Sequence, residues 1–563
     1  MIRSTRRTRV VARSGTAPSR AARSAAPALL LIPVLLAAAC GSSESSTSTT
    51  EGPARAESLT VAVAKDTGPL NIFAGASDQM TELVYDKLLS PSPYVADPQP
   101  WLATDVRQVD PTTWEVDLRD DVTWHDGEAF TADDVAFSYH YMHAAPTGRF
   151  THHVNDTPSI STVEATSPTS VRFVCDYACP ELGTVTLADL PVLPEHVWSK
   201  VDPATAKEVT ELPIGTGPFE LVDYSPTTGY RFEANADYFA GAPTVDELVM
   251  PVIADSSAAF TALSSGQVDA VDRALTPELV DQFTASNDIG TITVAPLTYP
   301  ELKLNFTREP FAQADFRAAL NFAVDRDQML DIVGLGQGRP GTQGYVHPDA
   351  PFADPDASTP YDPAQATALL DSLGWKDIDG DGTRENPAGD DAPFTLIVNG
   401  GDAPQVRAAE LIAEDFAEVG IDVVVSPLDA GSLSDASAKK NFDLYVTTNS
   451  PHAVADSTQF IMSHRSGNLW SHPDLAYPEF DALYERWRAT ETNEARIAAM
   501  QEMQELFNRQ PTAIALYYPD ETWAFRADRF AGWVETPGYG IVHKWSFLPS
   551  DVVDAANAEA PQD

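Results

Sequence analysis

The chain has 563 residues, a length that favours two or three domains over a single hydrophobic core. It contains 36 Lys and Arg residues against 82 Asp and Glu residues, which gives a formal net charge of -46 at pH 7. This acidic composition excludes nucleic acid as a partner and disfavours electrostatic docking on anionic lipid.

The first segment, 1–39, predicts a signal peptide. It has seven arginines and no acidic residue, and its apolar run is shorter than the roughly 20 residues that a membrane-spanning helix needs. Cys40 resembles the cysteine of a bacterial lipobox, although Ala37 stands where leucine is usual, and the resemblance implies that Cys40 is lipidated after cleavage. Residues 40–57 then predict a flexible Ser/Thr-rich tether. We therefore expect an extracytoplasmic protein, anchored at the cell membrane by lipid.

The folded part begins with a predicted strand at 59–63, and its most informative pattern lies at 111–142. Alternation of apolar and charged residues over 114–118 predicts a strand, and a turn and a helix follow. Thr131 is the expected N-cap of that helix, with Asp134 as its capping-box partner. We interpret His125 as part of a hydrogen-bonded turn, not as a ligand or a catalyst.

The order of residues in this segment, LRDDVTWHDGEAFTADDVAFS, closely resembles the signature of family 5 of the bacterial extracellular solute-binding proteins. These are the oligopeptide- and dipeptide-binding components of ABC importers. Further matches are TELVYDKL at 81–88 and PIGTGPF at 213–219, where the glycines indicate backbone crowding and not a phosphate loop. The resemblance extends to residue 545.

The resemblance implies an α/β protein with the two-lobed type II fold of periplasmic binding proteins and an extra subdomain inserted in lobe one. The expected boundaries are lobe one at 58–297 and 526–551, its insert at about 98–212, lobe two at 298–525, and a tail at 552–563. Periodicity predicts the following elements of the second half: a strand at 302–306, helices at 315–330, 406–419 and 495–507, and strands at 421–425, 513–518 and 522–525.

Cys175 and Cys179 are separated by three residues. Two cysteines outside the cell can pair, and we expect a local disulfide, with a free pair as the alternative. A metal site would need further Cys or His residues nearby, and the neighbouring sequence has none.

A candidate calcium loop begins at Asp377. Asp377, Asp379 and Asp381, followed by Gly382, match the opening of an EF-hand loop. The twelfth position, where a bidentate glutamate is expected, is Ala388. The sequence therefore predicts either a structural calcium ion or a solvated acidic turn, and no other cofactor.

The sequence predicts no enzymatic activity. It lacks G-x-S-x-G and H-E-x-x-H motifs, and the S-x-x-K match at 437–440 has no accompanying K-T-G. The resemblance implies instead a monomer that captures a solute, expected from the family to be a peptide, and delivers it to the permease and ATPase of an ABC transporter. A solute-sensing receptor, import of an oligosaccharide or metal chelate, and a secreted hydrolase are the alternatives.

The resemblance also indicates ligand contacts. In peptide-binding relatives, an aspartate of lobe two receives the amino terminus of the ligand, and Asp456 stands at the matching position. Pro451 and His452 replace the aromatic residue expected before it. A non-peptide solute therefore remains an alternative ligand. Further candidates for the pocket are Phe73, Gly75, Tyr299 and Tyr539, for which packing in the core or in a loop is the alternative.

Overall fold

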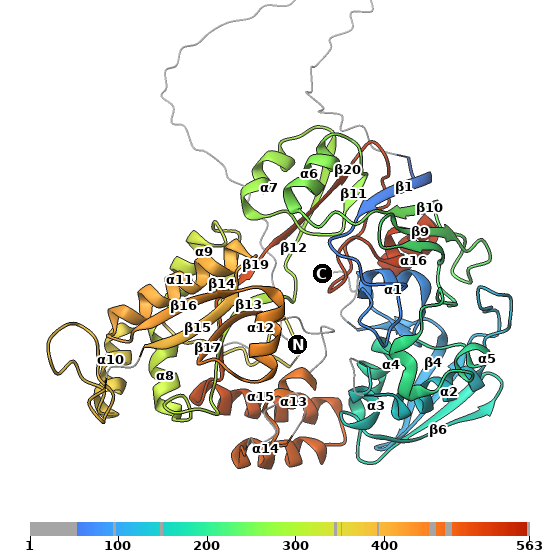
Figure 1. Ribbon diagram of the computed structural model, residues 1–563. Coiled ribbons are helices and arrows are strands. Elements are labelled where there is room, and N and C mark those ends of the chain that lie inside the picture. Colours follow the sequence, from blue (N-terminus) through green and yellow to red (C-terminus); the bar gives the residue numbers. More distant parts are fainter. Residues whose placement is uncertain are drawn as a thin grey trace, which may run out of the picture. The chain divides into compact units, whose positions relative to one another are not determined.

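The computed structural model describes most of the chain beyond the tether (Figure 1). Within the described ranges, no helix combines the length and apolar character needed to cross a bilayer. The residues described are 53–93, 97–146, 150–342, 346–350, 352–390, 393–449, 458–467 and 476–559.

Lobe one is built on a seven-stranded mixed sheet with β1 at its centre. β1 runs parallel to both β10 and β11, as expected for an α/β fold, and the remaining neighbours pair antiparallel. Two helices, α6 (Ser256–Ser264) and α7 (Pro277–Thr284), bury a small apolar core against β11. The strands in spatial order are β12 (Ile289–Val294), β20 (Glu521–Arg526), β11 (Ala270–Val271), β1 (Ala56–Ala62), β10 (Val245–Met250), β9 (Gly229–Ala234) and β8 (Phe219–Ser225).

The inserted subdomain contains a four-stranded antiparallel sheet and the predicted capped helix. α2 (Ala132–Ala144) begins after Thr131, whose backbone N–H donates to Asp134 Oδ2 at 2.9 Å. Its face of Val135, Tyr139 and Met142 is buried, as the periodicity predicts. The sheet strands in spatial order are β4 (Ala103–Asp110), β5 (Thr113–Leu118), β7 (Ser170–Cys175) and β6 (Ile160–Ser167). The smaller elements are β2 (Leu89–Ser90), β3 (Gln99–Pro100), α3 (His152–Asn155), α4 (Thr186–Asp189) and α5 (Glu195–Trp198).

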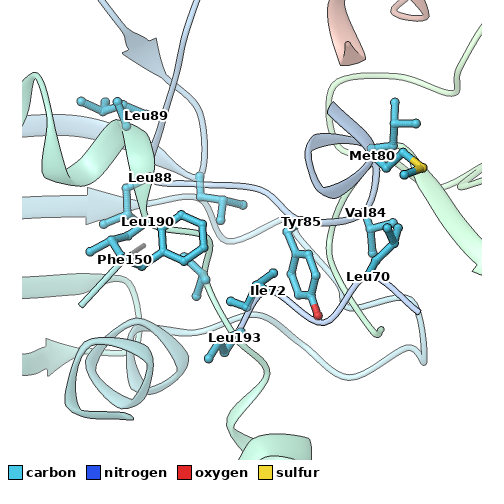
Figure 2. Packing of buried hydrophobic residues seen from close by; sticks show 14 of the residues in the cluster. Leu70, Ile72, Met80, Val84, Tyr85, Leu88, Leu89, Phe150, Leu190 and Leu193 are labelled. Carbon is cyan, nitrogen blue, oxygen red and sulfur yellow. The ribbon is translucent and has the colours of Figure 1, made fainter. Parts of the chain in front are cut away.

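A short helix, α1 (Asp78–Val84), connects lobe one to its insert. Helix α1 covers only the first part of the matching segment 81–88, because the backbone becomes extended at Tyr85. The residues after it join one continuous core in which Tyr85 and Leu88 pack with Leu190 and Leu193 of the insert (Figure 2). The core of lobe one therefore extends into the inserted subdomain.

Lobe two is built on a second mixed sheet, with its own apolar core. Helices α8, α9, α10 and α11 contribute to this core, which includes Leu302, Phe316, Leu396 and Phe416. The strands in spatial order are β16 (Val423–Leu428), β15 (Phe394–Asn399), β17 (Leu444–Asn449), β13 (Tyr299–Leu304) and β18 (Ala513–Ala515). The helices are α8 (Ala314–Ala323), α9 (Arg326–Ile332), α10 (Pro363–Ser372), α11 (Ala403–Glu418) and α12 (Ala430–Ala438).

The single helix predicted at 315–330 is wrong. The chain forms α8 and α9, and the break lies at Val324 and Asp325, which are extended. Asp325 is the N-cap of α9, since its side chain accepts a hydrogen bond from the backbone N–H of Gln328 at 2.9 Å. This local bond replaces the continuation of α8.

Three further helices of lobe two enclose a separate core. Met500 and Met503 are buried in it, in agreement with their interpretation as core residues. The helices are α13 (Thr458–His464), α14 (Pro478–Arg488) and α15 (Asn493–Arg509). The chain ends its described part with α16 (Ser550–Glu559).

The chain passes from one large sheet to the other beside a single pair of strands. β12 and β20 are antiparallel partners from Ile289 and Arg526 to Val294 and Glu521. Residues 295–298 lead from β12 into β13, and β19 (Tyr517–Pro519), which pairs with β14 (Gly338–Pro340), precedes β20. Residues 522–525 were predicted to belong to lobe two, whereas they pair within the sheet of lobe one, with a partner strand more than 200 residues earlier.

Candidate functional site

Two of the family-like motifs contact each other directly through His125. The backbone N–H of His125 donates to Gly215 O at 2.9 Å, and its Nδ1 accepts from the N–H of Gly215 at 3.2 Å. Its Nε2 lies 3.0 Å from Gly217 O. Burial lowers the pKa of His125, so the ring is neutral and Nε2–H is the donor. His125 therefore fixes a turn, as its sequence context predicts.

The glycines of the second motif are required by the end of α1. A Cβ at Gly215 would lie 1.8 Å from Val84 O, and one at Gly217 would lie 2.5 Å from Leu83 O. The N–H of Gly217 donates to Val84 O at 2.8 Å. This close approach of two backbones admits no side chain, and it explains the motif without a phosphate.

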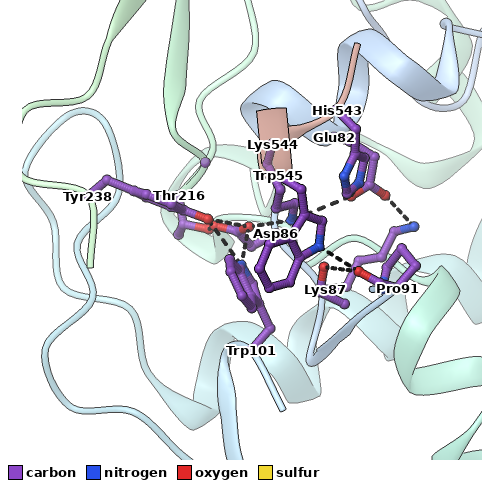
Figure 3. Close-up of polar contacts among 12 residues, drawn as sticks. Glu82, Asp86, Lys87, Pro91, Trp101, Thr216, Tyr238, His543, Lys544 and Trp545 are labelled. Atoms are coloured by element: carbon purple, nitrogen blue, oxygen red, sulfur yellow. Dashed lines mark hydrogen bonds and ion pairs between the residues drawn. The ribbon is translucent and has the colours of Figure 1, made fainter. Parts of the chain in front are cut away.

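A buried network of charged residues lies beside this turn (Figure 3). Lys544, near the C-terminus, places Nζ 2.7 Å from Asp86 Oδ1 and 3.4 Å from Glu82 Oε2. Lys87 forms a second ion pair with Glu82, and all four side chains are at most 6% exposed. The sequence did not predict this network, because Lys544 comes from the far end of the chain.

The network is satisfied by hydrogen bonds as well as by opposite charges. Asp86 accepts from Trp101 Nε1 at 2.8 Å, from Tyr238 OH at 3.0 Å and from Thr216 Oγ1 at 3.0 Å. Burial alone would raise the pKa of Glu82, but the two lysines and the bond from His543 hold that pKa far below its usual range. Both carboxylates thus serve the fold of lobe one.

Tyr539, a predicted pocket residue, belongs to the same network. Its hydroxyl accepts from Lys87 Nζ at 3.0 Å, and the side chain is 5% exposed. It lines a cavity of about 10 Å³ together with Glu82 and Lys87, room for one water molecule at most. This environment is that of a packed residue.

The other two candidates of lobe one share a loop. Phe73 is half-buried, with its ring centroid 5.2 Å from that of Trp198 and 5.6 Å from that of Tyr141. Gly75 is exposed and has a φ of +85°, and a Cβ added to it would meet no atom within 4 Å. The loop therefore offers one aromatic face and one open backbone position.

Tyr299, on β13 of lobe two, is 1% exposed and packs against Tyr518 with ring centroids 5.0 Å apart. Two residues on, Glu301 is fully buried on the same face of the strand. Its Oε1 lies 3.3 Å from Lys303 Nζ, and its Oε2 accepts from Asn449 Nδ2 at 3.3 Å. Sequence reasoning missed this carboxylate, although a glutamate on the same face as a candidate tyrosine was a usable signal.

Asp456, together with Pro451 and His452, lies outside the described residues. The structure therefore places the four remaining candidates in three environments: the loop of Phe73 and Gly75, the network of Tyr539, and the face of β13 with Tyr299.

The Asp377 loop brings its three carboxylates together. Oxygen atoms of Asp377, Asp379 and Asp381 all lie within 4.8 Å of one another, and the three side chains are exposed. Asp377 also accepts from the N–H groups of Gly380 and Gly382, at 2.6 and 3.1 Å. Carboxylate oxygens are the type of ligand that Ca²⁺ prefers.

Cys175 and Cys179 are joined by a disulfide that closes the turn after β7. The expected local pairing is confirmed, and the free pair is not.

Comparison with known proteins identifies the family. The model of the bacterial extracellular solute-binding proteins, family 5, middle part, matches residues 97–470. The chain belongs to this family.

Relatives of this family 5 protein match it along most of its length. Protein XP55 of Streptomyces lividans is 29% identical over 499 residues, which are 85% of this chain and 87% of XP55. The solved structure of the oligopeptide-binding protein AppA of Bacillus subtilis with a nonapeptide superimposes with a TM-score of 0.74 at 22% identity, covering 88% of this chain and 99% of AppA.

A second solved structure has a different ligand. NikA of Brucella suis, in complex with Fe(III)-EDTA, gives a TM-score of 0.75 at 22% identity and covers 87% of this chain and 99% of NikA. These structures confirm the two-lobed fold of the family 5 protein, and the family itself is one of solute-binding proteins.

Proposed function

We propose that this protein captures a peptide outside the cytoplasm and delivers it to the permease and ATPase of an ABC importer. The observation that carries the proposal is the membership in family 5, together with a fold shared with a nonapeptide-binding protein. Two lobes with separate cores, joined beside the β12–β20 pair, supply the mechanism. A ligand that contacts both lobes stabilises one arrangement by its differential affinity, and the permease recognises that arrangement.

The carboxylate of Asp456 is the proposed partner of the peptide's amino terminus, with Phe73 and Gly75 near the ligand. Tyr299 and Tyr539, which are 1% and 5% exposed, would support the site by packing and not by direct contact. Glu301 adds a buried negative charge on the strand that carries Tyr299. A ligand ammonium paired with a carboxylate forms a charge-assisted hydrogen bond, which is stronger than a neutral one.

We further propose that the mature protein is a monomer anchored by lipid at Cys40. The leader 1–39 and the polar tether after Cys40 support this proposal. Several acyl chains on one cysteine anchor a protein stably, whereas one chain holds it only marginally.

A metal chelate is the second candidate solute, and the Fe(III)-EDTA complex of NikA favours it. A sensing receptor would bind solute in the same way, and the two roles differ only in the response to a permease. Reconstituted uptake in vesicles that contain the permease and ATPase separates them, because a receptor supports no uptake. A peptidase and esterase screen of the same preparation tests for a hydrolase, and we expect no turnover.

The test is a thermal-shift screen of the chain from Gly41 onward with di- to nonapeptides, oligosaccharides and Fe(III)-EDTA. A ligand that binds only the folded state at 100 times its Kd adds about 2.7 kcal/mol to the free energy of unfolding, so Tm rises by several degrees. We expect a peptide to raise Tm in the wild type and in Asp435→Ala, an exposed control, but not in Asp456→Ala. A response to Fe(III)-EDTA alone would contradict the peptide assignment, and an unchanged response of Asp456→Ala would contradict its role.

A further inference from the structure

A loop of the inserted subdomain contacts the helices of lobe two. It runs from Cys175 to Gly183, begins with the disulfide, and packs through the short helix Pro180–Gly183 against α15. Six side chains carry the contact, and together they are called the latch here. They are Asp156, Tyr177 and Glu181 of the inserted subdomain, and Arg465, Arg488 and Arg496 of lobe two.

The centre of the latch is a buried ion pair. Arg496 Nη2 lies 3.0 Å from Glu181 Oε2, and the two side chains are 3% and 6% exposed. The same guanidinium donates to the carbonyl of Ala178, inside the disulfide loop, and lies 4.0 Å from the ring centroid of Trp487. Burial lowers the pKa of Arg496 and raises that of Glu181, because removal of water disfavours both charges.

The outer contacts of the latch are more exposed. Arg465 binds both oxygens of Asp156, at 2.6 and 2.9 Å, and its Nη1 also donates to Tyr484 OH at 2.8 Å. The guanidinium of Arg488 lies 4.4 Å from the ring centroid of Tyr177. Bidentate pairing and stacking of this kind fix orientation as well as adding energy.

This chemistry makes the contact an all-or-none element. When the two surfaces meet, each buried charge has its partner, and when they separate, water solvates both charges. A partly separated arrangement leaves a desolvated charge unpaired, which is strongly unfavourable. The pair therefore selects one relative arrangement of the two surfaces more than it adds net stability.

The disulfide holds the loop in the shape that the arginines recognise. The N–H groups of Cys175 and Cys179 donate to Thr112 O and Pro111 O, at 2.8 and 3.0 Å, which ties the loop to the start of β5. A closed loop of this kind has fewer conformations when undocked, so less entropy is lost on docking.

We propose that the latch, with its loop held in shape by the disulfide, stabilises one arrangement of the two lobes and thereby sets the affinity for solute. The link to affinity rests on the proposed function. A contact present in only one of two arrangements shifts their equilibrium, and the apparent affinity of a ligand specific for that arrangement changes in proportion.

The first test needs no ligand, so its outcome is independent of the proposed function. Spin labels at Glu164→Cys on β6 and Glu505→Cys on α15, both exposed, report the distance between inserted subdomain and lobe two by pulsed electron paramagnetic resonance. We expect one narrow distance peak in the otherwise wild-type protein and its loss, toward longer distances, in Arg496→Met. Arg486→Met is the matched control, because Arg486 pairs with Glu502 within lobe two.

A double variant separates the charge pair from general disruption. Glu181→Met with Arg496→Met leaves no unpaired buried charge, so we expect the narrow peak to return. Cys175→Ser with Cys179→Ser should broaden the peak, with circular dichroism showing that the fold is kept. Should Arg496→Met fail to fold, Asp156→Asn takes its place, since that pair is partly exposed. An unchanged distance peak in Arg496→Met, or in Asp156→Asn where that variant replaces it, would overturn the latch. An unchanged peak in the variant without the disulfide would overturn the role of the loop.

Discussion

At the scale of single residues, the most consequential feature is the set of buried ion pairs in lobe one. Lys544 has no exposed side-chain surface and carries contacts to both Asp86 and Glu82. Such a pair adds little net stability when intact, but removing one partner leaves the other charge buried and uncompensated.

We therefore expect Lys544→Met to lower the free energy of unfolding by about 3–5 kcal/mol, measured by urea denaturation. Lys439→Met is the control, because Lys439 pairs with Asp435 on the exposed surface of α12 and should change stability little. Equal effects of the two substitutions would contradict the importance of the buried network.

A second residue, Asp415 of α11, predicts a pH dependence. It is 5% exposed and accepts a hydrogen bond from the N–H of Asp325 at 3.0 Å. Burial, together with the nearby charges of Asp325, Glu418 and Glu414, raises the pKa of Asp415 to about 7. Because the folded-state pKa is raised, the contribution of this group to stability is complete below the unfolded-state pKa of about 4 and is lost as pH rises through about 7.

Asp415→Asn removes this ionisation while keeping an acceptor for Asp325. We expect its Tm to exceed that of the wild type at pH 9 and to equal it within about a degree at pH 3.5, below the unfolded-state pKa. Glu410→Gln, at an exposed position of the same helix, should show no such difference. A Tm gap that is independent of pH would show that Asp415 does not ionise in this range.

At the scale of elements, local signals in the sequence predicted local structure well. The capped helix α2 follows from residues within a few positions of each other. The turn around His125 has a local bond, from Gly127 N–H to Trp124 O, but it is also held by Gly215 and Gly217, which are distant in sequence. The break between α8 and α9 was missed although Asp325, followed by Gln328, is a local cap signal, because the apolar periodicity on both sides continues through it.

The Asp377 loop carries an element-scale prediction that stays untested. We expect millimolar Ca²⁺ to raise the Tm of the mature protein, and Mg²⁺ to do so less, because Mg²⁺ demands stricter octahedral geometry. Asp379→Ala should abolish the Ca²⁺ response, whereas Asp371→Ala, at an exposed aspartate outside the loop, should keep it. Equal responses of both variants would favour a solvated acidic turn.

At the scale of the whole molecule, the sequence predicted the family and the two lobes from short, ordered motifs. It did not predict which distant segments pair. Lys544 meets Asp86 across 458 residues of sequence, and β20 joins the sheet of lobe one. No periodicity or spacing encodes such partners, because they are chosen by packing in three dimensions. For the same reason, the sequence indicated Tyr299 and Tyr539 as pocket candidates but did not predict the residues that surround them.

The contacts between Lys544 and the two carboxylates also set an order of events during synthesis. Glu82, Asp86 and Lys87 leave the ribosome early, but the sheet beside them lacks β20, and the network lacks Lys544, until the chain is almost finished. Lobe two, by contrast, has all of its strands from a single continuous stretch of chain. The lobe that begins the protein is thus the last to be completed. A chain interrupted before β20 carries an open sheet, and a chain interrupted between β20 and residue 544 still lacks the lysine that pairs with Asp86.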